Sequence, residues 1–363
     1  MSPKPTPPPQ YTDRSGDSGV LSPLSERVCA PAELALPTSE HGLIWRELRQ
    51  EDMPALLDLE RAVDEADDPG ATTDLEDLEE RLESPGFDPL TDSMIALTPE
   101  GSAVAYGEAF LEASGESIAT VHVNGRVHPK WRRQGLGAQL LRWQEGRGTQ
   151  QLAASDQRLP GMLSTLVGEH AEGQRALFEA EGFAPARWWL EMEYVLDGTF
   201  PEAPLAEGLQ IEPYAARWSE QARLAINEAF RDHWGSQPTS REEWDDARQA
   251  DDFRADWSAV AIATHPDGTK ELVGAITIEG DEEEWESFGY RFGNVDEVAV
   301  KREWRGRGIA SALLTRSMRA MHAAGMERAT LDVDGDSPTG AHALYARLGF
   351  VETERSVTYA KTF

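Results

Sequence analysis

The sequence is short of cysteine, of basic residues and of long apolar runs, and each shortage excludes a class of protein. Its only cysteine, Cys29, lies in a proline-rich N-terminal stretch, which excludes a disulfide framework or a cysteine metal cluster in the folded part. The 34 basic residues face 65 acidic ones, and the resulting net charge of −31 repels nucleic acid and anionic membranes. No stretch approaches the roughly 18 apolar residues of a membrane span, and the opening MSPKPTPPPQYTDRSGDSGV has no apolar run typical of a signal peptide. We therefore expect a cytoplasmic protein that binds no metal, nucleic acid or membrane.

Length and hydrophobic periodicity favour two similar domains. The 363 residues with 40% apolar content can fill two cores, and both halves repeat the order strand, two helices, three strands, helix, strand, helix, strands. We predict an α/β fold in which each domain has a mixed central β-sheet flanked by helices. The predicted boundaries are a disordered proline-rich tail at 1–40, a first domain at 41–197, a linker at 198–207 and a second domain at 208–363.

A basic, glycine-containing turn occurs once in each half, between a strand and a helix. It reads WRRQGLG at 131–137, after a strand that ends at Val127, and WRGRGIA at 304–310, after a strand that ends at Val300. Small residues at a helix N-terminus let backbone N–H groups approach an anion, which the helix dipole also favours. We interpret both turns as pyrophosphate-binding loops. Their candidate binding residues are Arg132, Gly135 and Gly137 in the first copy, and Arg305, Gly306, Arg307, Gly308, Ile309 and Ala310 in the second.

These turns, the valine strands before them and the later segment LYARLGF resemble the GNAT superfamily of acyl-coenzyme A dependent N-acetyltransferases. The resemblance covers both halves of the chain, and the tandem arrangement further resembles the mycothiol synthase-like group, on architecture alone. It implies that acetyl-coenzyme A is the cosubstrate and that each R-x-x-G-x-G/A turn holds the coenzyme A pyrophosphate. The backbone N–H groups of Val298 and Val300 would then bind the thioester and the pantetheine.

The resemblance also implies that only the second half is catalytic. A tyrosine at the position of Tyr345 protonates the coenzyme A thiolate in similar enzymes, whereas the first half has Phe178 there, which has no proton to donate. The N-terminal domain is therefore expected to be catalytically degenerate.

The strand before the second turn carries the candidate base. In the family, an acidic or histidine residue at the position of Asp296 or Asn294 often accepts the amine proton, and we assign this role to Asp296. Regular alternation places Asn294, Asp296, Val298 and Val300 on one face of the strand, so Glu297 is the alternative base if a bulge rotates the strand. The corresponding face of the first half carries Val121, Val123 and Gly125, which offer no base.

The acceptor is expected near the loop RDHWGSQPTS, in which His233 and Trp234 are candidate substrate contacts together with Asn294. We predict transfer of acetyl to a primary amine of a small molecule by direct attack in a ternary complex, because the core has no cysteine for a covalent intermediate. Two alternatives stay open at this point: acetylation of a protein or peptide amine, and a non-catalytic acyl-coenzyme A sensor. The sequence leaves open whether the protein is a monomer or a homodimer.

Overall fold

The computed structural model describes residues 21–38, 42–67, 73–82, 86–112, 117–231, 238–337 and 340–363. Their contacts divide the chain into two compact units. The first consists of the described residues up to Arg187 together with Ser356–Phe363, and the second of Trp188–Arg355. The first unit is therefore completed by the C-terminal segment of the chain, whereas the second unit is one continuous segment.

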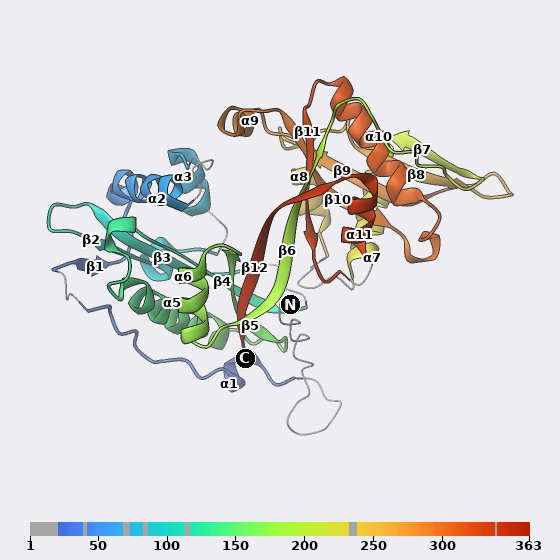
Figure 1. Cartoon of the computed structure of the whole chain (residues 1–363). Helices are drawn as coiled ribbons and strands as arrows, with labels where there is room; N and C mark the ends of the chain where they lie inside the picture. The colour runs from blue at the N-terminus through green and yellow to red at the C-terminus, as the bar shows by residue number, and fades with distance from the viewer. Residues whose placement is uncertain are drawn as a thin grey trace. The chain divides into compact units, whose positions relative to one another are not determined.

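The first unit is a mixed sheet with helices on both faces (Figure 1). Its strands have the order β1-β2-β3-β4-β5-β12, in which only β4 and β5 are parallel. The strands are β1 (Ile44–Arg46), β2 (Ser93–Leu97), β3 (Ala103–Leu111), β4 (Ala119–Val127), β5 (Gly161–Gly168) and the last part of β12 (Val351–Thr362). The helices are α1 (Leu24–Arg27), α2 (Met53–Asp67), α3 (Leu75–Leu82), α4 (Pro89–Asp92), α5 (Leu136–Ala153) and α6 (Glu172–Ala180), with short 3₁₀ turns at Gln50–Asp52 and Pro129–Trp131.

The second unit repeats this topology strand for strand. Its order is β7-β8-β9-β10-β11-β6, and again only one pair, β10 with β11, is parallel. The strands are β6 (Ala184–Val195), β7 (Leu209–Pro213), β8 (Ala259–Thr264), β9 (Lys270–Glu279), β10 (Phe292–Val300) and β11 (Arg328–Asp334). The helices are α7 (Ser219–Phe230), α8 (Arg241–Ala247), α9 (Glu282–Phe288), α10 (Ile309–Ala323) and α11 (Ala341–Leu348), with 3₁₀ turns at Ala216–Trp218 and Arg302–Trp304. The predicted mixed sheet flanked by helices is confirmed.

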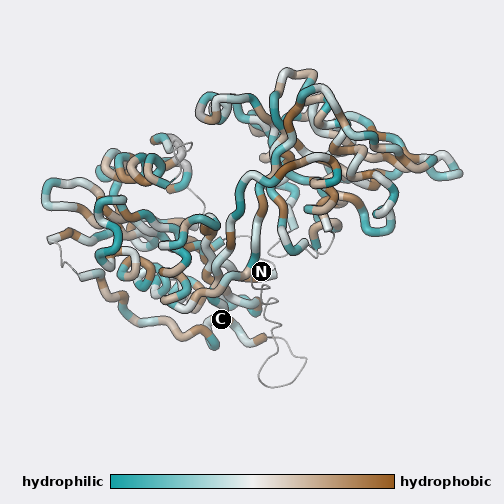
Figure 2. Tube along the Cα trace, viewed as in Figure 1, coloured by the Kyte–Doolittle hydropathy of each residue, from teal (hydrophilic) through white to brown (hydrophobic). Residues whose placement is uncertain are grey.

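Each sheet separates two hydrophobic cores. In the second unit, α10 and α11 pack on one face of the sheet, where Leu313 and Met318 are fully buried. The other face is covered by α7 and α8, with Trp244 of α8 buried there. In the first unit α2 and α3 cover one face and α5 the other. Figure 2 shows hydrophobic segments gathered along the central strands of each unit.

Part of the segment that the sequence assigned to a disordered tail is packed against the first unit. Leu24 is fully buried, and the Arg27 guanidinium donates to the carbonyl oxygens of Leu159 and Phe363. The side chain of Gln150 donates to the carbonyl of Pro31 at 2.8 Å. The few apolar residues of this segment are ordered by tertiary contacts, which local composition does not reveal.

Candidate active site

A β-bulge interrupts β10 at the position of the candidate base. Val295 pairs with Ile278 and Glu297 with the next residue of β9, Thr277, so Asp296 is the extra residue. As a result Val295 and Val298 both pack against the core that contains α10, whereas Ala299 packs against the core that contains α7 and α8. The regular alternation predicted for this strand is therefore wrong, and Glu297 lies on the α7 and α8 face together with Ala299.

The edge of β10 beyond the bulge is open toward β11. The two parallel strands pair only from Phe292 to Asn294 of β10, and no pairing continues beyond them among the described residues. The Lys301 amide donates to the carbonyl of Val273 in the β9 segment, so by alternation the peptide groups of Val298 and Val300 point away from β9. These are the two groups that the sequence analysis assigned to the thioester and pantetheine, and they lie at the open edge.

The turn after β10 leads into the N-terminus of the 15-residue helix α10. Gly306 and Gly308 adopt φ values of 75° and 79°, a left-handed conformation that glycine tolerates without strain. The carbonyl of Gly308 accepts from Ala312. Within the described part of the chain, the backbone N–H groups of residues 306–311 have no acceptor. This set of free donors at a helix N-terminus fits a pyrophosphate group.

The arginine that opens the turn binds protein groups. Arg305 donates from Nε to the carbonyl of Val300 at 3.2 Å and from Nη2 to the carbonyl of Ala229, near the end of α7, at 3.2 Å. Its guanidinium thus connects the turn to the strand before it and to a helix on the sheet. Arg307 lies over the Trp304 ring, with its guanidinium carbon 4.6 Å from the ring centre.

Tyr345 of α11 is buried in the same core as α10. Its ring meets that of Phe350 edge-on at 5.9 Å, and the amide of Phe350 donates to its carbonyl. Burial raises the pKa of the Tyr345 hydroxyl to about 12, so the phenol keeps its proton at neutral pH. Val298, at the open edge of β10, packs against the same core.

The two candidate bases have different surroundings. Asp296 accepts two hydrogen bonds on Oδ2, from Thr277 Oγ1 at 3.0 Å and from Arg248 Nη2 at 3.2 Å. Glu297 is half-buried, and its carboxyl has no hydrogen-bond partner among the described residues. Burial, and then the nearby charge of Asp296, raise the pKa of Glu297 to about 8.

A third carboxyl lies close to these two. Glu279, at the end of β9, has a pKa raised to about 7 by burial first and then by the charges of Asp296 and Asp252, and it shares a hydrogen bond with Asp296. Within the described residues, no group of three or more His, Cys, Asp or Glu side chains is placed to hold a metal ion. Glu279 and Glu297 therefore keep their protons up to a higher pH than ordinary glutamates do.

Sequence reasoning missed Arg248 and Glu279. No motif contains either residue, and they reach the cluster only because the segment after α8 and the end of β9 meet at the bulge. Asn294 lies one residue before the strand begins to bulge and accepts from Thr330 Oγ1 of β11 at 3.2 Å. The predicted substrate contacts His233 and Trp234 lie outside the described residues.

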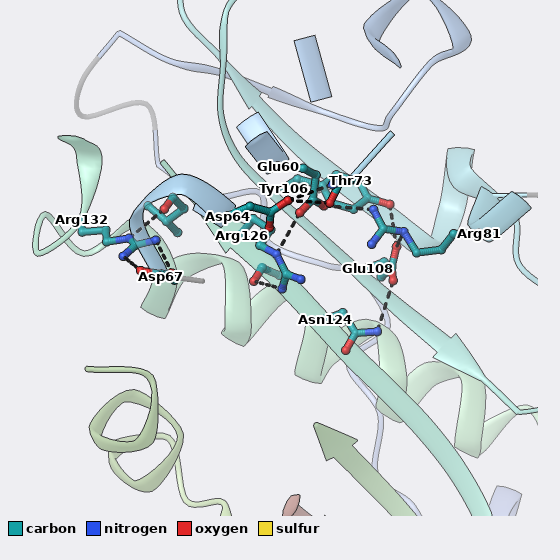
Figure 3. Close-up of polar contacts among 12 residues, drawn as sticks. Glu60, Asp64, Asp67, Thr73, Arg81, Tyr106, Glu108, Asn124, Arg126 and Arg132 are labelled. Atoms are coloured by element: carbon teal, nitrogen blue, oxygen red, sulfur yellow. Dashed lines mark hydrogen bonds and ion pairs between the residues drawn. The ribbon is translucent and has the colours of Figure 1, made fainter. Parts of the chain in front are cut away.

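The first unit has a turn of the same form. Its arginine, Arg132, donates from Nε to the Val127 carbonyl at 3.0 Å, and its other nitrogens bind the Asp67 carboxylate at the end of α2 at 2.6 and 2.7 Å (Figure 3). Arg133 takes the place of Gly306 and adopts the same left-handed conformation, with φ of 62°. Because that conformation is unfavourable for arginine, its retention indicates that the turn geometry is strongly determined. Gly135, with φ of 85°, begins α5, and Gly137 lies in its first turn.

The first unit has different residues at the positions that correspond to the candidate catalytic residues. Phe178 occupies the place of Tyr345 and makes the same edge-on contact, at 5.4 Å, with Phe183. Asn124 precedes Val127 by the same spacing as Glu297 precedes Val300, so Asn124 corresponds to Glu297. The Asn124 amide donates to Glu108 at 3.3 Å. Figure 3 shows that this region is occupied by a polar network of side chains from two helices and two strands, which consists of Glu60, Arg81, Tyr106, Glu108, Asn124 and Arg126.

Comparison with known proteins agrees with this architecture. The family model described as "Acetyltransferase (GNAT) family" matches residues 224–350. A mycothiol acetyltransferase of Streptomyces coelicolor is 30% identical over 235 residues, which are 64% of this chain and 69% of the relative. Another, of Kytococcus sedentarius, is 29% identical over 322 residues, 86% of this chain and 95% of the relative. The crystal structure of a GCN5-related N-acetyltransferase from Sphaerobacter thermophilus has a TM-score of 0.70 and 27% identity, and the match covers 90% of this chain and 97% of that one.

The chain belongs to the GNAT family of acetyltransferases, and its two units of like topology make it a tandem member. The resemblance seen in the sequence is thereby confirmed. The protein is an acyltransferase, and the cosubstrate of its family is an acyl-coenzyme A. No helix among the described residues has the length and apolar character needed to cross a membrane.

Proposed function

We propose that the second unit transfers acetyl from acetyl-coenzyme A to a primary amine of a small molecule. Relatives named mycothiol acetyltransferases support a small acceptor. The free N–H groups of residues 306–311 and the open edge of β10 support binding of the pyrophosphate and pantetheine in this unit. The protein's net charge of −31 attracts cations, so it favours an acceptor that arrives as a cation.

The reaction needs one proton acceptor and one proton donor. When bound, acetyl-coenzyme A supplies the thioester carbon that the amine nitrogen attacks, so that an N–C bond forms and the C–S bond breaks. Glu297 takes the proton that the cationic amine must lose before it can attack, and Tyr345 gives its hydroxyl proton to the leaving sulfur. The nitrogen loses a second proton as the amide forms, and this proton restores the Tyr345 hydroxyl. The peptide N–H of Val298 donates to the carbonyl oxygen, which becomes negative during attack. Direct attack is supported by Cys29, the sole cysteine, being exposed and in the first unit.

The observation that carries this proposal is the bulge, which places Glu297 on the same face as Ala299 with a half-buried carboxyl that has no hydrogen-bond partner among the described residues. Asp296, our first assignment from the sequence, has one oxygen occupied by two donors. A carboxylate whose protonated form has a pKa of about 8 is also a stronger base than an ordinary glutamate, so it is better suited to take a proton from an amine near neutral pH. We therefore assign the base to Glu297.

The test is coenzyme A thiol release over a panel of small primary amines, measured for the wild type and for Glu297→Gln. We expect the substitution to lower kcat/KM by roughly 10²- to 10⁴-fold, because a positioned base contributes about that much. Binding of acetyl-coenzyme A, measured by calorimetry, should be unchanged because the turn and the open edge are intact.

The matched control is Glu354→Gln, which neutralises an exposed glutamate elsewhere in the second unit and should leave kcat/KM unchanged. Wild-type turnover by Glu297→Gln would remove Glu297 from the reaction. Tight binding of acetyl-coenzyme A with no thiol release for any amine, or release with peptide amines alone, would contradict the proposed activity itself.

A further inference from the structure

Asp296 is the most firmly held carboxylate of the cluster. Its Oδ2 accepts from Thr277 of β9 and from Arg248 of the segment after α8, at 3.0 and 3.2 Å. Asp296 is the extra residue of the bulge. The bulge turns the strand, so that the next residue, Glu297, lies on the face that also carries Ala299. Two contacts from separate elements thus fix a negative charge directly beside the proposed base.

Arg248 is itself held in one place. Its guanidinium carbon lies 4.6 Å from the centre of the Trp244 ring and 4.3 Å from that of Phe253, so the cation contacts both aromatic rings. Its side chain is only 9% exposed. Its Nε and Nη1 atoms are buried and have no hydrogen-bond partner in the described part of the chain. Asp296 is therefore the carboxylate that binds this buried guanidinium.

The charges that act on Glu297 come from three elements. Asp296 belongs to its own strand, Glu279 comes from β9, and Arg248 follows α8. Asp252 acts on the cluster through Glu279. The two acidic groups disfavour ionisation of Glu297 and Arg248 favours it, so the balance between them decides at which pH the base is free to act.

We propose that Asp296 is a positioning residue, which Arg248 and Thr277 hold beside Glu297 so that its fixed charge sets when the base gives up its proton. This inference rests on the proposed function, in which Glu297 is the base. Asp296 itself takes no proton from the acceptor. Arg248 acts through Asp296, and the Trp244 and Phe253 rings act by fixing Arg248.

The inference predicts opposite effects for the two partners. Removal of the Asp296 charge makes Glu297 ionise more easily, so its acid limb moves to lower pH, and the base also becomes intrinsically weaker. Removal of the Arg248 charge leaves the carboxyls without their cation, so the limb moves to higher pH. A residue with a merely structural role would lower activity without moving the limb in a defined direction.

The test is the pH dependence of kcat/KM between about pH 6 and pH 10, roughly two units on either side of the expected pKa. For the wild type we expect an acid limb with an apparent pKa of about 8. Asp296→Asn, which is nearly isosteric, should move this limb down by about one unit, and Arg248→Met should move it up. Arg248→Lys keeps the charge and should return the limb toward its wild-type position.

The control is Asp246→Asn, which removes an exposed carboxylate of α8 and should leave the limb in place. A limb that stays fixed in both Asp296→Asn and Arg248→Met, or that moves in the same direction in both, would overturn the inference. A loss of turnover in Asp296→Asn at every pH, with Glu297→Gln fully active, would instead make Asp296 the base and contradict the proposed function.

Discussion

At the scale of single residues, the arginine of each turn has a role that its motif does not suggest. Arg305 and Arg132 both donate from Nε to the carbonyl of the valine that ends the preceding strand. Both also reach the end of the first long helix of their unit, where Arg305 meets the Ala229 carbonyl and Arg132 meets Asp67. The side chain fixes the turn, and we infer that the backbone N–H groups of the turn are the anion donors.

Arg305→Met should therefore weaken acetyl-coenzyme A binding by loosening the turn. The loss of two hydrogen bonds from a charged donor predicts a roughly tenfold higher Kd, about 1.4 kcal/mol. Hydrogen exchange should become faster at residues 305–311 while Tyr345 and Glu297 keep their places. The measurement is calorimetric titration together with amide exchange.

Arg305→Lys is the matched variant, because it keeps the charge but cannot reach both carbonyl acceptors in the same way. It should resemble Arg305→Met. If Arg305→Lys bound acetyl-coenzyme A as tightly as the wild type, the main role of Arg305 would be charge attraction to the phosphate. The inferred role of fixing the turn would then be wrong.

At the scale of elements, the two units differ most in what lies between the sheet and its first two helices. In the second unit this side of β10 carries the Glu297 carboxyl, which has no hydrogen-bond partner in the described part of the chain, whereas in the first unit this side is filled by the network of Figure 3. Glu60 of α2 is 2% exposed and binds Arg81 of α3 at 3.0 Å and Arg126 of β4 at 2.9 Å. Three elements are thus joined through one buried carboxylate.

Glu60→Gln should destabilise the first unit by about 2–3 kcal/mol, because two arginines lose a charged partner. Urea unfolding followed by far-UV circular dichroism measures the change. Glu65→Gln, at an exposed position of the same helix, should stay within about 0.5 kcal/mol of the wild type. Equal stability of the Glu60→Gln variant would mean that the network fills space without contributing to the fold, and turnover at the second unit should be unaffected in either case.

The elements that sequence predicts well are those specified locally. The turns at 131–137 and 304–310 and their helices can be read from spacing and residue type, and the contrast of Tyr345 with Phe178 follows from the family resemblance. The bulge at Asp296 cannot, because it depends on the register between β10 and β9. Arg248 and Glu279 were missed for the same reason, since only pairing and packing bring them to the strand.

At the scale of the whole molecule, the last strand of each unit's sheet is distant in sequence from the strand with which it pairs. The segment Ser356–Phe363 completes the sheet beside β5, and β6 completes the sheet beside β11. Pairing between segments so distant in sequence has no local signal, so the sequence predicts two consecutive domains. Both turns keep their geometry, but among the described residues a phenol and a carboxyl without a hydrogen-bond partner lie at the candidate catalytic positions of the second unit alone. We therefore propose that both units bind acyl-coenzyme A and that only the second reacts.

The most direct test uses the Glu297→Gln, Tyr345→Phe double variant, titrated with acetyl-coenzyme A by calorimetry and then supplied with the best amine of the panel. We expect two equivalents of acetyl-coenzyme A bound per chain, as in the wild type, and thiol release reduced by at least about 10²-fold. One equivalent bound would show that the first turn is no longer a binding site. Thiol release at the wild-type rate would place the chemistry in the first unit and contradict the account.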